Sequence, residues 1–86
     1  MTQRWLEKDG QVIDLPNLTA VIAKEGSWYV STCPELGVAS QGATRNEAYR
    51  MLSEAVALWL EHASAAELKR QLRRGARVKT LELAYA

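Results

Sequence analysis

The chain of 86 residues has few of the side chains that small proteins use for covalent or metal-bound cores. Cys33 is the only cysteine and His62 the only histidine, so the sequence excludes an intrachain disulfide and lacks a full set of zinc ligands. No apolar run approaches the ~20 residues of a membrane span, and the opening residues lack the apolar stretch of a signal peptide. These absences predict a cytoplasmic protein that folds without disulfides, metals or cofactors.

The remaining composition is sufficient for a single domain, residues 1–86, folded around an apolar core. Hydrophobic residues make up 48% of the chain and charged residues 24%, which is ordinary for a soluble domain. The net charge of +1 hides an uneven distribution, because basic residues gather in the second half. Six of them follow one another with no acidic residue between: Lys69, Arg70, Arg73, Arg74, Arg77 and Lys79.

The first half of the chain predicts antiparallel strands. Asp9-Gly10 is a favoured two-residue hairpin turn, so residues 1–17 form either a hairpin or an irregular arm. The segments that follow are rich in apolar and β-branched residues and are separated by glycine-containing links. They predict strands over residues 18–23, 28–33 and 38–41.

The second half predicts two helices and a last strand. Thr44 and Glu47 form a capping box, in which the Thr44 hydroxyl accepts from the Glu47 amide and the Glu47 carboxylate reaches back to Thr44. A second box at Ser64 begins a helix that Gly75 ends, and residues 78–85 alternate like a strand. The predicted order is β-β-β-α-α-β, an α+β two-layer sandwich with an antiparallel sheet and helices on one face.

Short motifs follow one another in a fixed order between residues 18 and 61. They are Tyr29-Val30, Pro34-Glu35-Leu36-Gly37, Ser40-Gln41-Gly42, Thr44 and Glu47-Ala48. This ordered set resembles the HicB antitoxin family. The resemblance implies a degenerate ribonuclease H-like fold and a domain that binds and neutralises a small basic toxin that cleaves messenger RNA. Many family members add a C-terminal DNA-binding module; residues 62–86 hold the second helix and terminal strand instead, so we expect a lone HicB-like domain.

Five residues are candidate contacts for such a partner: Trp28, Tyr29, Pro34, Glu35 and Leu36. Trp28 and Tyr29 point to opposite faces of their strand, so one of them lies away from the helices and is a candidate anchor for a partner. The sequence leaves open which one it is. The apolar terminal strand over residues 78–85 also predicts self-association, with a homodimer as the default.

Two other functions stay open. The basic segment 69–79 is a candidate nucleic-acid surface, or simply a solvated helix face. Its candidate contacts are Lys69, Arg70, Arg73, Arg74 and Arg77. Cys33 is a candidate nucleophile if His62 lies within hydrogen-bond reach, but a core thiol and a capping or surface histidine are the favoured interpretation of the two residues. The sequence has no metal-binding spacing and no phosphate-binding glycine loop. We therefore expect a binding protein and not an enzyme.

Overall fold

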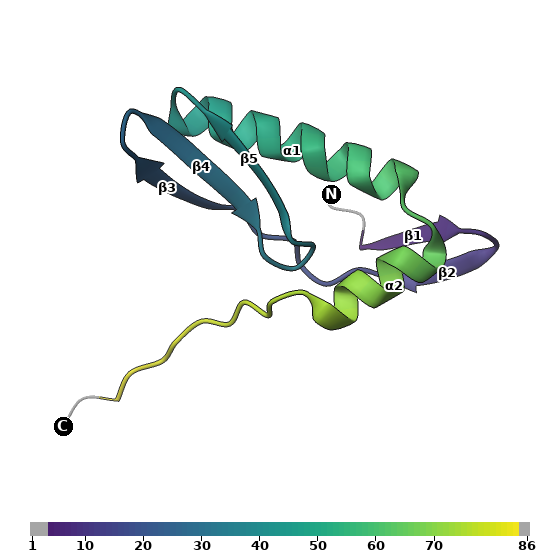
Figure 1. Ribbon diagram of the computed structural model, residues 1–86. Helices are drawn as coiled ribbons and strands as arrows, with labels where there is room; N and C mark the ends of the chain where they lie inside the picture. The colour runs from purple at the N-terminus through teal and green to yellow at the C-terminus, as the bar shows by residue number, and fades with distance from the viewer. Residues whose placement is uncertain (1–3, 85–86) are drawn as a thin grey trace.

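The computed structural model describes residues 4–84, which form five strands followed by two helices (Figure 1). The strands pair in two antiparallel sheets, one of two strands and one of three in the order β3-β4-β5. The fold is α+β, as predicted. The elements are β1 (Trp5–Lys8), β2 (Gln11–Asp14), β3 (Val21–Glu25), β4 (Trp28–Cys33), β5 (Val38–Gly42), α1 (Arg45–His62) and α2 (Ala65–Arg74).

The N-terminal segment is a hairpin, which settles the choice between a hairpin and an irregular arm for residues 5–14. Asp9 and Gly10 both have positive φ, 51° and 74°, as a tight two-residue turn between twisted strands requires. The register pairs Trp5 with Asp14 and Lys8 with Gln11. The turn predicted from the Asp-Gly dipeptide is therefore confirmed.

The tip of this hairpin joins the two helices. The Lys8 Nζ donates to the backbone oxygen of Glu61 at 2.7 Å, near the end of α1. The Asp9 carboxylate accepts from the Ala65 amide at 2.9 Å, at the first residue of α2. A cation thus meets the negative end of one helix dipole and an anion the positive end of the next. This pair of contacts fixes the hairpin against the α1–α2 corner.

The three-stranded sheet is covered by α1 on one face (Figure 1). Ser31, in the central strand, is fully buried and donates from Oγ to the backbone oxygen of Ala48 at 2.8 Å. Its cross-strand neighbours are Ile22 in β3 and Ser40 in β5, which therefore share the helix-facing side. The second helix, α2, has its main strand contacts with β2, and its Leu68 shares the core cluster with Cys33 of β4. The predicted helical layer over the three-stranded sheet is therefore formed chiefly by α1.

Both predicted helices are confirmed, with one change in the first cap. The Thr44 side chain accepts from the Glu47 amide at 3.0 Å, as expected, but the Glu47 carboxylate accepts from the Ala43 amide at 3.1 Å and not from Thr44. In α2, the Ser64 hydroxyl accepts from the Glu67 amide at 3.1 Å. Within residues 4–84, neither helix is long and apolar enough to cross a membrane.

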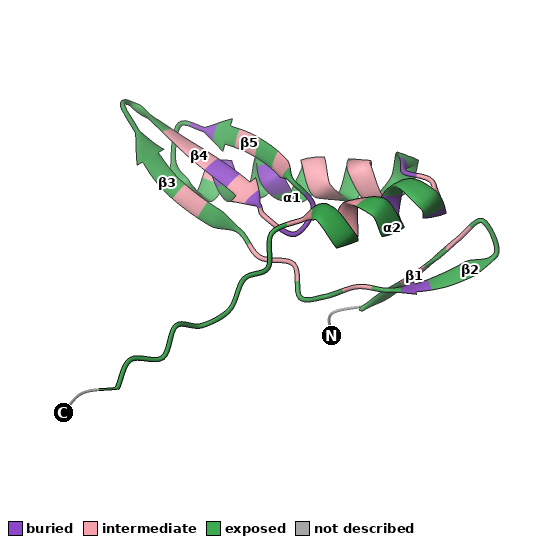
Figure 2. Ribbon diagram, turned by 60° about the horizontal axis from the view of Figure 1, so that its bottom comes forward, coloured by how far each residue is buried: buried purple, intermediate pink, exposed green. Residues whose placement is uncertain are grey.

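The predicted terminal strand is wrong for the residues that the structure describes. Residues 76–84, here named the tail, form neither helix nor strand and extend away from the body (Figures 1 and 2). The reason is that alternating apolar residues make a strand only when a sheet edge pairs with them. Tyr85, the last residue of the predicted strand, lies outside the described residues.

Candidate functional site

The face of the three-stranded sheet that points away from α1 is defined by the alternation of β4. Ser31 and Cys33 are buried toward α1, at 0% and 1% exposed, so Trp28, Val30 and Thr32 point to the opposite side. Cross-strand pairing adds residues of β3 and β5 to that side. We name it the open face, made of Val21, Ala23, Glu25, Trp28, Val30, Thr32, Ala39 and Gln41.

Trp28 is the large aromatic residue of the open face, and it is 51% exposed. Tyr29 lies on the helix-facing side, where the Arg45 guanidinium stacks 4.8 Å from its ring centroid. The structure therefore selects Trp28 as the candidate anchor and gives Tyr29 a role between sheet and helix. One signal in the sequence indicates which of the two faces inward. Free cysteines are among the most buried residues, and Cys33 lies on the same side of the strand as Tyr29 because the two are four residues apart.

The loop after β4 is part of the core, so Glu35 and Leu36, predicted as partner contacts, present little surface in the folded chain. Leu36 is 2% exposed and Glu35 is 7% exposed. The Glu35 carboxylate accepts from the Thr19 amide at 2.9 Å and from the Thr19 hydroxyl at 2.6 Å. It thereby ties the β4–β5 loop to the segment that leads into β3. Pro34 is half-buried, and its carbonyl accepts from the Ala76 amide at 3.0 Å.

The ionisation of Glu35 and Cys33 follows from this packing. Burial raises the pKa of the Glu35 carboxyl, but the two hydrogen bonds from Thr19 outweigh it and hold the pKa below its usual value. Burial raises the pKa of the Cys33 thiol, and the hydrogen bond from the Leu36 amide opposes this rise. The Glu35 carboxylate, whose Oε1 lies 3.4 Å from the Cys33 Sγ, raises the pKa of the thiol further. A protonated, 1% exposed thiol is a poor nucleophile, so the structure gives the Cys33 hypothesis no support.

The other half of that hypothesis also lacks support. His62 is exposed at the last position of α1 and serves as a basic residue in its final turn. Among residues 4–84, no group of three or more histidine, cysteine, aspartate or glutamate side chains is placed to hold a metal ion.

The five basic residues singled out in the sequence lie together on the outer side of α2 and at its exit. Leu68 is fully buried on the inner side, which turns the cations toward solvent. Lys69 donates to the side-chain oxygen of Gln11. Within residues 4–84, the ion pair found is Arg50–Glu54 on α1, at 3.4 Å. In that part of the chain the basic face therefore carries exposed charge without ion pairs: Lys69, Arg70, Arg73, Arg74 and Arg77.

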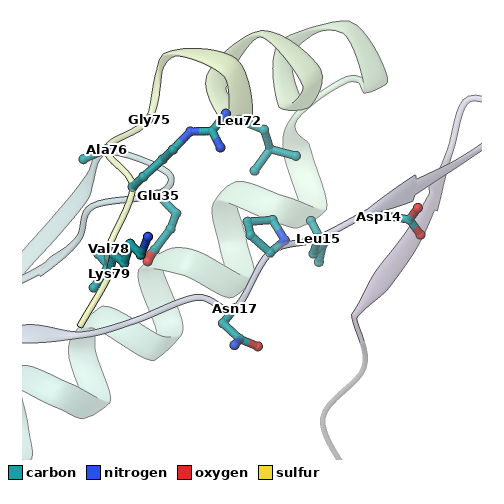
Figure 3. A pocket seen from close by; sticks show the side chains of 11 residues that line it. Asp14, Leu15, Asn17, Glu35, Leu72, Gly75, Ala76, Val78 and Lys79 are labelled. Atoms are coloured by element: carbon teal, nitrogen blue, oxygen red, sulfur yellow. The ribbon is translucent and has the colours of Figure 1, made fainter. Parts of the chain in front are cut away.

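A groove of about 650 Å³ lies where the tail leaves the body (Figure 3). Residues 14–17 form one side and residues 75–79 the other, with Glu35 and Leu72 between them. Gly75 approaches the Glu35 backbone so closely that a Cβ on it would lie 1.9 Å from the Glu35 oxygen. Two carboxylates line the groove: that of Glu35 is already bonded to Thr19, and that of Asp14 is exposed at the end of β2.

Comparison with known proteins places the chain in a family. A model described as a family of unknown function (DUF7387) matches residues 14–74, and the chain belongs to this family. The match runs from the last residue of β2 to the last residue of α2, so it contains the three-stranded sheet and both helices. No curated protein and no solved structure matches the chain.

Proposed function

We propose that this chain is a non-catalytic, protein-binding domain of the HicB antitoxin type, acting in the cytoplasm. Its partner is a small basic protein that cleaves messenger RNA, and the chain neutralises it by covering its active site. The chain contributes no reacting group to this process. The observation that carries the proposal is the open face, where a half-exposed tryptophan stands on a sheet that a helix supports from behind.

The chemistry of the open face suits a protein partner with basic residues. Trp28 offers a large amphipathic contact, the side-chain type most enriched at energetic centres of interfaces. Val21 is 51% exposed on the same face and adds apolar area. Glu25 is the direct cross-strand neighbour of Trp28 and is exposed, so a carboxylate stands beside the anchor. A negative charge at this place favours a cationic partner surface.

The proposal predicts that Trp28→Ser abolishes neutralisation and leaves the fold intact. Loss of the anchor is expected to weaken partner binding by about 2 kcal/mol or more, roughly 30-fold. The thermal midpoint changes little because the side chain is already half-exposed. The test expresses a short basic protein encoded beside this chain's gene, which should arrest growth, and measures rescue by the wild-type chain and by the variant.

Trp5→Ser is the matched control, because Trp5 is 50% exposed and lies in β1, away from the open face. It should rescue growth as the wild-type chain does. Rescue by Trp28→Ser at the wild-type level would contradict the open-face mechanism. A neighbouring gene product that neither arrests growth nor binds the chain would contradict the antitoxin assignment.

A second candidate function is nucleic-acid binding by the basic face, which the exposed cations on α2 favour. It predicts binding that weakens steeply with salt, by about 0.9 log units per log unit of salt for each phosphate contact on duplex DNA. The triple variant Arg70→Ala, Arg73→Ala, Arg74→Ala should reduce both the affinity and this slope. Removing Arg4, Arg45 and Arg50 gives a control of equal net charge. No gel shift at low salt would eliminate this function.

A further inference from the structure

Within residues 4–84, the outer edge of β3 has no partner strand. In the three-stranded sheet, β3 pairs with β4 on one side, and no other described strand adjoins it. An edge strand of five residues presents backbone donors and acceptors that another extended segment can use. Figure 2 shows β3 as a largely exposed strand.

A second feature lies next to this edge. A groove of about 270 Å³, the edge groove, separates the start of β3 from α1. Leu18 and Ala20 line it from the β3 side, and Tyr49, Ser53 and Val56 line it from the helix. Thr19, Cys33 and Leu52 complete its lining, so the groove lies between the sheet and α1, beside the residues that lead into β3. A strand added beside β3, at the usual spacing of ~4.8 Å, would place alternate side chains in this groove.

The tail has the pattern that such a strand needs. Val78, Leu81 and Leu83 are 54%, 81% and 64% exposed, so the tail leaves three apolar side chains in solvent within a short stretch. Leu81 and Leu83 share one side of an extended chain with Lys79, and Thr80 and Glu82 share the other side with Val78. Residues 76–84 contain no proline to interrupt a ladder. Two leucines would enter the edge groove while the polar pair stays in solvent.

We infer that residues 78–83 form a fourth strand on the β3 edge of a second copy of this chain, and that two copies exchange tails. The single chain leaves both features unfilled: the tail is held at Ala76 by the Pro34 carbonyl and then runs away from the body. Every copy carries one tail and one edge. A two-fold exchange therefore satisfies both in a closed dimer.

The exchange is tested by sedimentation velocity of the full chain and of Leu81→Glu/Leu83→Glu. The wild-type chain should sediment as a dimer. The double variant should raise the dimer dissociation constant by about 100-fold or more, because four buried leucines are lost per dimer. The change leaves the folded monomer unaffected, since both side chains are exposed in it. Thr80→Glu/Ala84→Glu adds the same charge to the tail without removing either leucine and is the control.

The receiving side has its own variant. Ser53→Arg places a long cation in the edge groove and should weaken the dimer as the tail variant does. Leu58→Arg is its control, because Leu58 is 57% exposed on α1 and does not line this groove. Trp28→Ser should leave the dimer intact while it abolishes neutralisation. Loss of the dimer and loss of partner binding can therefore be distinguished.

Three results would overturn the exchange. The first is a wild-type monomer whose tail amides exchange freely. The second is a monomer whose tail amides are protected, which would put the strand on its own β3. The third is a dimer that the Leu81 and Leu83 changes leave unaltered.

Discussion

Gly42→Ala is expected to lower the free energy of unfolding by about 3 kcal/mol, at the upper end of what overpacking costs. A Cβ at Gly42 would lie 2.5 Å from the Ala48 nitrogen and 2.8 Å from the Glu47 carbonyl carbon. Both are backbone atoms of α1, so no side chain can turn away. The Ser31 hydrogen bond to the Ala48 oxygen holds this part of the helix on the sheet. Urea unfolding followed by circular dichroism measures the loss.

Gly26→Ala is the control for this substitution. Gly26 has a φ of 63°, but no atom lies within 4 Å of the position that an alanine Cβ would take, so the cost is backbone strain alone, about 1 kcal/mol. If the two variants lose equal stability, crowding between β5 and α1 is not what fixes Gly42. If Gly42→Ala loses clearly more, the close approach of strand and helix is supported.

Glu35→Gln is expected to cost about 2 kcal/mol at neutral pH, the value of hydrogen bonds to a charged group. The substitution keeps the size of the side chain but replaces the charged carboxylate, which accepts hydrogen bonds from the Thr19 amide and hydroxyl, with a neutral amide. Thr19→Val should cause a similar loss. The double variant should lose less stability than the sum of the two single losses, because both substitutions remove the same interaction. Urea unfolding of the wild type, the two single variants and the double variant gives this double-mutant cycle.

The same carboxylate makes stability depend on pH. The folded pKa of Glu35 lies below its ordinary value of 4.5. Its contribution is therefore present in full above that ordinary value and is lost as the pH falls through the lower folded pKa. Wild-type protein should lose more stability than Glu35→Gln between neutral and strongly acidic pH. Glu7→Gln, at an exposed position in β1, should retain the wild-type profile. Identical profiles for wild type and Glu35→Gln would contradict this role.

Local signals in the sequence predicted most of the fold. The Asp9-Gly10 turn, the strand Trp28–Cys33 and the caps at Thr44 and Ser64 each depend on a few neighbouring residues, and each is present in the structure. Such signals are readable because turn and cap chemistry acts over about four residues. They fix where elements begin and end.

Features that depend on contacts distant in sequence were not predictable in this way. Glu35 reads as a surface acid, and its burial requires Thr19, which is 16 residues earlier. Gly75 ends α2 as predicted, but its φ of −61° is not the left-handed conformation of a glycine cap. A glycine is required there because the chain passes close to the Glu35 backbone. The tail reads as a strand because its apolar residues alternate, but no strand of the described chain pairs with it.

The sequence predicted only part of the candidate site, because the site also depends on contacts between residues distant in sequence. Strand alternation requires that Trp28 or Tyr29 faces outward, and the placement of α1 shows that Trp28 does. In the motif Pro34-Glu35-Leu36, Glu35 and Leu36 pack inward and stabilise the sheet. These side chains support the open face from behind instead of forming it.

The most direct test of the open face uses two tryptophans of equal exposure as internal probes. Trp28 is 51% exposed and Trp5 is 50% exposed, so hydroxyl radicals should oxidise both at similar rates in the free chain. Oxidative footprinting by mass spectrometry is then repeated with the bound basic partner. We expect Trp28 to become protected several-fold while the oxidation of Trp5 stays unchanged. Unchanged oxidation of Trp28 in a complex shown to be saturated would contradict binding through the open face.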